Sequence, residues 1–231
     1  MDTATGSKNV MRRIRSFVKR EGRMTSAQQR ALDELWPRYG VGVGRKIDFH
    51  GLFQRDCPVV LEIGFGNGES LAIMAQQNPD RCYLGVEVHR PGVGSLLLNI
   101  ERLRLSNLRL SMTDSVELLQ TQIPDASLAA VQIFFPDPWP KARHHKRRLV
   151  QPDFVQLLHR KLQPGGTLHL ATDWPDYAEQ MLLVMEAADG FTNVAGPGKW
   201  LPRPAWRPET KFERRGIKLG HPVHDLMYSR R

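Results

Sequence analysis

The chain has 231 residues, of which 41% are hydrophobic, so it is long enough and apolar enough to bury a substantial core. It contains no apolar stretch of the roughly 18 residues that a membrane helix needs, and we expect no membrane association. The two cysteines, Cys57 and Cys82, are too few for a disulfide scaffold and lack the spacing of a metal site. We expect both cysteines to be small buried residues with free thiols. Such thiols are typical of a reducing compartment, so we expect the protein to be cytoplasmic.

The net charge of +9 is concentrated in two short segments. Residues 8–30 hold eight Lys or Arg residues against one Glu, and residues 141–148 hold five Lys or Arg residues and no acid. The rest of the chain is therefore slightly acidic, a distribution typical of a folded body with two binding regions for a polyanion. We expect residues 1–23 to form a basic arm that is disordered without RNA. A targeting presequence has a similar composition and is the alternative for this segment.

The apolar pattern predicts alternating strands and helices along one domain that spans residues 24–231. Residues 24–36 predict a helix that Pro37 ends, and residues 37–57 predict turns. Strands are expected at 59–63, 83–88, 108–112, 128–135, 167–171, 191–195 and 223–229, and the helices between them are expected to end near 77, 105, 123, 162 and 188. This alternation predicts an α/β, Rossmann-like doubly wound fold with a mainly parallel seven-stranded sheet and helices on both faces.

A glycine-rich turn follows the first predicted strand. Gly64, Gly66 and Gly68 form a G-x-G-x-G pattern between a strand and a helix, where a ligand can approach the backbone and the helix N-terminus. Glu62 precedes this turn inside a strand that should be apolar on both faces. Burying a carboxylate without a partner is costly, so Glu62 faces either a structural cation or the cation of a ligand.

Two further carboxylates occupy the ends of the next two predicted strands. Glu87 lies about 20 residues beyond the turn, which suits a carboxylate that accepts hydrogen bonds from a ribose. Asp114 follows the third strand and either accepts from an adenine amino group or caps the next helix. Three acids would repel a diphosphate, so the ligand expected against the glycines is a cationic nucleoside, and S-adenosylmethionine meets that description. No metal is expected, since His144 and His145 are adjacent and cannot share a helix face.

The fourth predicted strand runs into residues 134–141, which read Phe-Phe-Pro-Asp-Pro-Trp-Pro-Lys. The prolines restrict the backbone on both sides of Asp137 and hold its carboxylate in a stiff turn. A rigid acid beside an indole suits a planar polar group, and the cations that follow suit the phosphates of the same ligand. Trp139 either stacks on a base or packs in the core.

The glycine turn with its three acids resembles that of class I S-adenosylmethionine methyltransferases, and residues 135–141 and 210–213 are similar to segments of bacterial tRNA guanine-N7 methyltransferases. The resemblance covers nearly the whole chain. It implies transfer of a methyl group from S-adenosylmethionine to N7 of guanine 46 in the variable loop of tRNA. It also implies cofactor contacts at Glu62, Glu87, Asp114 and Asp137; catalysis at Asp137; substrate contacts at Lys141, Asp173, Thr210, Lys211, Phe212 and Glu213; and RNA contacts at Arg143, His144, His145, Lys146, Arg147 and Arg148.

Guanine N7 carries a lone pair and no proton, so its methylation needs no general base. Asp137 is expected to orient the guanine and to stabilise the cationic product ring. Asp173 and Glu213 are candidate acceptors for the N1–H and amino groups of the base. The alternatives are a helix cap for Asp173 and an ion pair with Arg214 or Arg215 for Glu213.

Other functions remain open from the sequence. Residues 136–139 also resemble the acid-Pro-Pro-aromatic motif of amino methyltransferases, although the order of the residues differs, so methylation of an exocyclic amino group is the runner-up. An RNA-binding protein without catalysis is disfavoured by the complete set of cofactor acids, and an NAD(P)-dependent oxidoreductase is disfavoured by the glycine spacing. We expect a monomer or a homodimer with tRNA as its partner.

Overall fold

The computed structural model describes residues 22–210, 213, 214, 216, 220 and 222–231. Residues 1–21, which make up nearly all of the predicted basic arm, lie outside this part of the chain. Lys211 and Phe212, two of the expected substrate contacts, also lie outside it. No helix within the described residues is long and apolar enough to cross a membrane.

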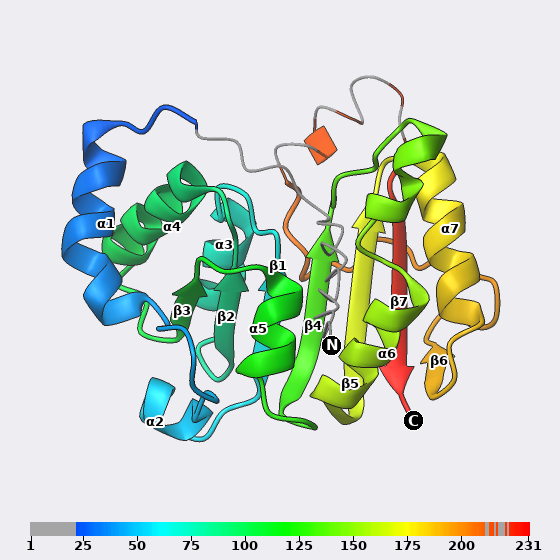
Figure 1. Cartoon of the computed structure of the whole chain (residues 1–231), viewed down its shortest axis with the longest axis horizontal. Helices are drawn as coiled ribbons and strands as arrows, with labels where there is room; N and C mark the ends of the chain where they lie inside the picture. The colour runs from blue at the N-terminus through cyan, green and yellow to red at the C-terminus, as the bar shows by residue number, and fades with distance from the viewer. Residues whose placement is uncertain (1–21, 211–212, 215, 217–219, 221) are drawn as a thin grey trace, which may run out of the picture.

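A seven-stranded sheet forms the centre of the molecule, with the strand order β3-β2-β1-β4-β5-β7-β6 (Figure 1). The strands are β1 (Val59–Ile63), β2 (Cys82–Val86), β3 (Leu108–Ser111), β4 (Leu128–Phe134), β5 (Leu162–Thr172), β6 (Phe191–Asn193) and β7 (His224–Arg230). The first five pair in parallel, whereas β7 runs antiparallel to both β5 and β6. The strand order reverses between β1 and β4, and in open α/β sheets ligands bind beyond the carboxyl ends of the strands at that point.

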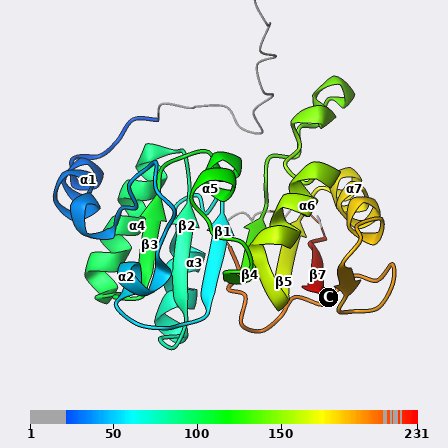
Figure 2. The ribbon, with the colours of Figure 1, turned by 60° about the horizontal axis from the view of Figure 1, so that its bottom comes forward.

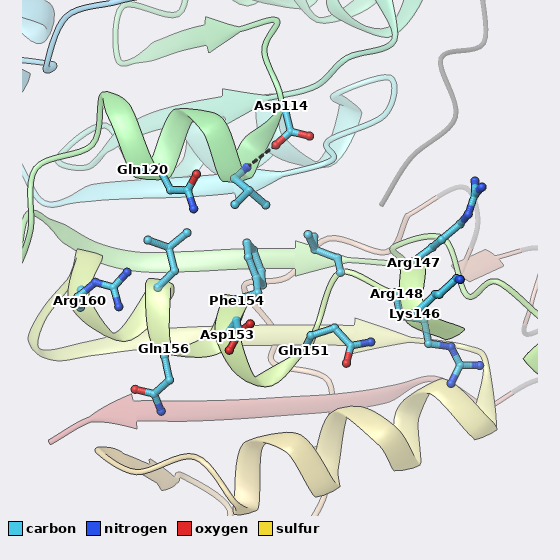
Figure 3. Close-up of a pocket in the computed structure, with 13 residues that line it drawn as sticks. Asp114, Gln120, Lys146, Arg147, Arg148, Gln151, Asp153, Phe154, Gln156 and Arg160 are labelled. Atoms are coloured by element: carbon cyan, nitrogen blue, oxygen red, sulfur yellow. Dashed lines mark hydrogen bonds between the residues drawn. The ribbon is translucent and has the colours of Figure 1, made fainter. Parts of the chain in front are cut away.

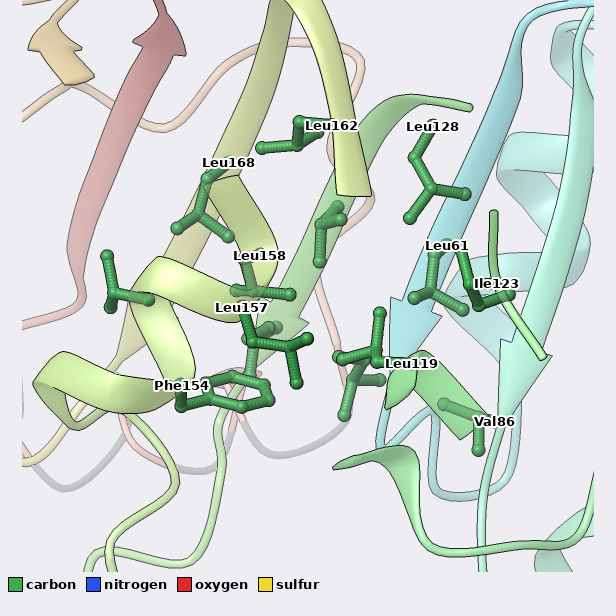
Figure 4. Close-up of a cluster of buried hydrophobic side chains, with 14 of the residues drawn as sticks. Leu61, Val86, Leu119, Ile123, Leu128, Phe154, Leu157, Leu158, Leu162 and Leu168 are labelled. Carbon is green, nitrogen blue, oxygen red and sulfur yellow. The ribbon is translucent and has the colours of Figure 1, made fainter. Parts of the chain in front are cut away.

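Helices cover both faces of the sheet (Figures 1 and 2). They are α1 (Ser26–Tyr39), α2 (Phe49–Phe53), α3 (Glu69–Gln77), α4 (Arg90–Leu103), α5 (Ser115–Thr121), α6 (Pro152–Lys161) and α7 (Pro175–Glu186). Neighbouring residues of β1 show the two faces: Val60 packs in the core cluster of α1, α3 and α4, and Leu61 packs in that of α5, α6 and α7 (Figure 4). Every residue of β1 is buried, as expected for a parallel strand between two helical layers. The predicted doubly wound α/β fold is confirmed.

The first helix does not end where the sequence predicts. Thr25 caps it through a reciprocal capping box with Gln28, but the helix continues past Pro37 to Tyr39. Tyr39 is buried, and its packing outweighs the backbone hydrogen bond that proline removes. Tertiary contacts also place α2 and a short 3-10 helix, η1 (Ala142–Arg147), in segments that the sequence does not predict as helical.

The expectation for the two cysteines is wrong. Cys57 and Cys82 form a disulfide, with their Cα atoms 5.8 Å apart. Cys57 lies just before β1 and Cys82 begins β2, and the parallel register that sets Val59 beside Cys82 brings the two side chains together. The pair lies at the amino ends of these strands. Because the thiols are paired, cysteine usage no longer supports a reducing compartment.

Candidate active site

The glycine turn after β1 lies where the strand order reverses. Gly64, Gly66 and Gly68 have φ angles of 75°, 58° and 71°, a region that glycine adopts freely and other residues rarely do. A Cβ atom on Gly64 or Gly66 would meet nothing within 4 Å, so the backbone of the turn borders open space. Gly68 is the N-cap of α3 and offers no capping side chain, which leaves the first N–H groups of the helix to other acceptors.

Glu62 is buried in β1 beneath this turn, with only 3% of its surface exposed. Its Oε2 atom has no hydrogen-bond partner among the described residues. Burial, and to a lesser extent the charge of Glu87, raises the pKa of Glu62 to about 8. The structural ion pair that was the alternative for Glu62 is not formed within this part of the chain, and its contact with a ligand cation stays a prediction.

Glu87, just beyond β2, is held against the glycine turn by backbone donors. Its Oε2 atom accepts from the N–H of Gly66 at 2.9 Å. Its Oε1 atom accepts from the N–H groups of Val88 at 2.7 Å and His89 at 3.0 Å. These bonds fix the carboxylate beside the turn, and its contact with a ribose stays a prediction.

Asp114 caps α5, which is one of the two roles that the sequence predicts for it. Its Oδ1 atom accepts from the N–H groups of Val116 at 2.9 Å and Glu117 at 3.1 Å (Figure 3). The cap holds the carboxylate at the carboxyl edge of the sheet, and its contact with an adenine stays a prediction.

Asp137 lies beyond the carboxyl end of β4, with its side chain exposed. Two residues of its turn have positive φ angles, Phe135 at 51° and Trp139 at 46°. Such backbone costs about 1–3 kcal/mol per residue and persists where the surrounding structure imposes it, often at functional sites. The N–H of Phe135 donates to the carbonyl of Ala171 on β5 at 2.8 Å, which ties the turn to the sheet. The turn is therefore held by the sheet as well as by its prolines.

Trp139 supports the basic turn, defined here as residues 141–148, rather than the core. The ring of His144 meets the indole edge-on with 5.8 Å between centroids, and the guanidinium of Arg147 lies 4.8 Å from the centre of the indole. Cation–π contacts of this kind contribute about 0.5–1 kcal/mol at exposed sites. The indole thus connects the Asp137 turn to the cations that follow it.

The basic turn stands out from the sheet beyond β4 and β5 (Figure 2). Lys141, Arg143 and Lys146 are exposed. Desolvation, followed by the charges of the neighbouring cations, lowers the pKa of His144. The turn therefore concentrates positive potential next to Asp137, which suits phosphate groups.

Arg148 does not lie on the surface, contrary to the expectation of an RNA contact. Only 1% of its side chain is exposed, and it pairs with Asp176 of α7. Its Nε donates to the carbonyl of Pro138 at 2.8 Å, and a terminal nitrogen donates to Gln180 at 2.6 Å. Arg148 ends a run in which Lys141, Arg143 and Lys146 are exposed, and it joins the Asp137 turn to α7.

The expected substrate residues Asp173, Thr210 and Glu213 come together from two segments. Asp173 follows β5 and is half-buried, and a Cβ atom on Gly216 would lie 3.1 Å from its Oδ2 atom. Thr210 and Glu213 form a capping box, because the N–H of Glu213 donates to Thr210 Oγ1 at 3.0 Å and the N–H of Thr210 donates to Glu213 at 3.3 Å. The Thr-x-x-Glu spacing is the sequence signature of such a box and could have indicated it.

Arg207 is a further residue that the sequence does not single out. It is fully buried and donates to the two carboxylate oxygens of Glu213 at 2.7 and 2.9 Å and to Asp225 of β7 at 2.9 Å. The alternative of an ion pair for Glu213 is thus formed, but with Arg207. This clamp joins the segment between β6 and β7 to the sheet, since Asp225 also lies 2.7 Å from His169 of β5.

The same segment reaches the glycine turn. Arg214 lies 4.0 Å from Glu69, the first residue of α3, which directly follows the turn. The expected substrate segment and the expected cofactor turn therefore meet at one edge of the sheet.

Several known proteins are similar to this chain in sequence over nearly its whole length. A family model described as "Putative methyltransferase" matches residues 56–226. A protein of Alcanivorax borkumensis named tRNA (guanine-N(7)-)-methyltransferase is 59% identical over 100% of this chain and 96% of its own length. One of the same name from Halorhodospira halophila is 59% identical over 94% of this chain and 95% of its own. The chain belongs to the tRNA (guanine-N7)-methyltransferase family.

A solved structure shows the fold of this methyltransferase at much greater sequence distance. The 16S rRNA methyltransferase KamB has a TM-score of 0.59 and 18% identity, covering 83% of this chain and 97% of that chain. At this identity the likeness supports the Rossmann-like fold alone.

A groove of this methyltransferase lies between α5 and α6 and begins beside Asp114 (Figure 3). Its volume is about 550 Å³. Lys146 and Arg147 lie toward one end and Arg160 toward the other, and the wall between them includes Gln120, Gln151, Phe154 and Gln156. Cations at both ends and amides along the wall suit a nucleic-acid strand.

Proposed function

We propose that this methyltransferase transfers the methyl group of S-adenosylmethionine to N7 of guanine 46 in the variable loop of tRNA, in the cytoplasm. One arrangement carries the proposal: Glu62 is buried without a described partner beneath the glycine turn, and Asp137 is exposed on a rigid turn beyond the neighbouring strand. The first acid is placed for a cationic cofactor and the second for a base that becomes cationic. The names of the relatives support guanine N7 of tRNA as the target.

The residues at the turn fit S-adenosylmethionine. Open space beside Gly64 and Gly66 allows a ligand to lie against the backbone. The unpartnered oxygen of Glu62 suits the positive charge of the cofactor, and Glu87 can accept from a ribose hydroxyl through Oε2, which has one backbone donor, whereas Oε1 already has two. The cofactor supplies a methyl group on a positively charged sulfur, which needs no metal for its activation.

The reaction asks the protein for alignment and electrostatic stabilisation rather than for proton transfer. Guanine N7 has a lone pair and no proton, so no side chain has to act as a general base. Asp137 orients the guanine and stabilises the positive charge that the ring gains. The positive φ angles of Phe135 and Trp139 and the flanking prolines hold this carboxylate in place before the substrate binds.

The tRNA backbone would follow the basic turn and the groove between α5 and α6. Lys141, Arg143 and Lys146 are exposed beside Asp137, and Arg160 extends the cationic path along α6. Phosphate contacts along this path would offset the few kcal/mol needed to extract a base from the folded tRNA.

Methyl transfer to two forms of one tRNA tests the proposal, one with guanine and the other with 7-deazaguanine at position 46. We expect transfer to guanine alone, because the deaza base lacks N7, and mass spectrometry of the digested tRNA should identify 7-methylguanosine. Equal transfer to both would contradict the proposal and indicate methylation of an exocyclic amino group.

A further inference from the structure

Three polar side chains form a row across the sheet beneath the glycine turn. Glu62 of β1 is in register with Gln132 of β4, and Gln132 is in register with His169 of β5. All three are buried, with 3%, 5% and 1% of their surfaces exposed. They face the side of the sheet where α3 and α4 pack, because residues two positions away along each strand belong to that core cluster.

Each member of the row has an acceptor that no described residue satisfies: Glu62 Oε2, Gln132 Oε1 and His169 Nδ1. Burial lowers the pKa of His169, which favours the neutral form of its ring. Its Nε2 lies 2.7 Å from Asp225 and donates to that carboxylate, which leaves Nδ1 as an acceptor. Buried polar atoms nearly always have partners. Three adjacent polar atoms therefore have no partner within the described part of the chain, which leaves them available to a ligand.

The Glu62 end of this row is suited to a cation with several N–H groups. In-register residues on adjacent strands lie about 4.8 Å apart, a spacing at which one nitrogen can donate to oxygen atoms from both. Glu62 supplies the negative charge once a cation lies beside it, because a nearby positive charge lowers the pKa of a carboxyl group and favours loss of its proton. Gln132 supplies a second acceptor without adding to the repulsion that Glu87 already exerts on Glu62.

The His169 end is less suited to a charged group. Its ring packs edge-on against Phe134 at 5.0 Å and Trp206 at 5.2 Å, and the buried cation Arg207 holds the neighbouring Asp225. Apolar rings and an existing cation disfavour a second positive charge there. A ligand cation is therefore expected between Glu62 and Gln132, directly below the glycine turn.

We propose that Gln132 acts with Glu62 to bind the α-ammonium group of S-adenosylmethionine, which makes Gln132 a specificity-determining residue for the cofactor. An ammonium group has three N–H donors and no acceptor. Two of its donors match the side-chain oxygens of Glu62 and Gln132, and the third matches a backbone carbonyl group of the turn. The inference rests on the proposed cofactor and adds a residue that lies outside the glycine motif.

Calorimetric titration with two ligands tests the role of Gln132. The ligands are S-adenosylhomocysteine and its deamino analogue, which lacks only the amino group. Gln132→Met keeps the length of the side chain and removes the acceptor. We expect it to bind S-adenosylhomocysteine about tenfold more weakly than wild type, because a hydrogen bond to a charged group is lost, and to bind the deamino analogue equally well.

Gln122→Met is the matched control. Gln122 is also buried, but its amide donates to the carbonyl of Gly42 at 2.7 Å near the amino ends of the strands. The control should lower the melting temperature and leave the affinities for both ligands unchanged. If Gln132→Met does not fold, Gln132→Asn shortens the side chain and should show the same ligand-dependent loss.

An equal loss for both ligands, or no loss for either, would overturn the assignment of Gln132. Wild type that binds both ligands equally would show that no ammonium is bound here, while leaving the cofactor proposal intact. Failure of wild type to bind S-adenosylhomocysteine would instead overturn the cofactor proposal and the inference with it.

Discussion

Two buried carboxylates of this protein have opposite surroundings. Glu62 beneath the glycine turn has an oxygen with no partner among the described residues, whereas both oxygens of Glu213 are held by Arg207. An unpaired buried carboxylate is costly and is kept where a ligand compensates for it, while a paired one orders the chain around it. We therefore expect Glu62 to bind a ligand, whereas Glu213 first of all positions the segment that carries it.

Removal of the cation that pairs with Glu213 has the largest expected effect on stability. Arg207→Met would leave Glu213 and Asp225 buried without their cation, and we expect the free energy of unfolding to fall by about 3–5 kcal/mol in urea denaturation. Arg203→Met is the control: Arg203 is half-exposed, lies 3.8 Å from Glu213, and should contribute less than about 1 kcal/mol. Equal effects of the two variants would contradict the clamp.

Replacing the unpaired Glu62 by a neutral residue should increase the free energy of unfolding of the ligand-free protein. The pKa of Glu62 is raised from its ordinary value of 4.5 to about 8, so the folded state binds this proton more tightly than the unfolded state. Wild type should therefore lose stability as pH rises from about 4.5 to about 8, and Glu62→Gln should remove a loss on the order of a few kcal/mol.

Urea denaturation of wild type and Glu62→Gln at about pH 5 and about pH 8 measures this difference. The advantage of the variant should grow with pH, and its affinity for S-adenosylhomocysteine should fall. A pH-independent difference would show that Glu62 is compensated within the protein.

Asp137 represents a third environment, an exposed carboxylate on a strained turn. Asp137→Asn keeps the shape of the side chain and removes the charge, so the rate of methyl transfer should fall about a hundredfold, which corresponds to about 2.7 kcal/mol. Single-turnover assays at saturating tRNA measure this rate, and filter binding measures tRNA affinity, which should change little. Glu179→Gln, at an exposed acid of α7, is the control, and a fully active Asp137→Asn would exclude charge stabilisation by this residue.

The smallest effects are expected for the cations of the basic turn and of α6. The exposed cations that line the groove are expected to bind RNA, whereas the buried Arg148 stabilises the fold. Lys146→Gln and Arg160→Gln should each reduce the slope of tRNA affinity against salt concentration by about one, because each would remove one of the phosphate contacts proposed along the groove. Arg148→Gln should instead lower the melting temperature, since its buried guanidinium joins Pro138 to α7. An unchanged slope for the first two variants would place the RNA elsewhere.

Most of the fold follows from local sequence pattern, and its departures have tertiary causes. Alternating apolar strands and helices predict the doubly wound sheet because each segment has to bury its own apolar face. The end of α1 beyond Pro37 depends on the burial of Tyr39, and the pairing of Cys57 with Cys82 depends on strand register. Neither burial nor register is visible in a window of neighbouring residues.

The site divides in the same way. Glu62 stands out in the sequence because a charge inside an apolar strand needs an explanation, and Asp137 stands out because prolines flank it. Arg207 does not stand out, because a single arginine in an irregular segment has no periodicity that indicates burial. Gln132 interrupts an apolar strand as Glu62 does, but burying an uncharged amide costs less than burying a charge, so it is a weaker signal in the sequence.

The sequence by itself determined which residues carry charge, where the backbone can turn sharply, and which faces must be buried, since these properties belong to each residue and its neighbours. Only the tertiary structure decided which charges are paired. Arg148 and Arg207 look like surface cations in the sequence, yet both are buried, and each pairs with a carboxylate of another element, Asp176 of α7 and Asp225 of β7. Pairing depends on distances between strands and loops far apart in the chain, and the cost of leaving a buried charge unpaired makes those distances decisive.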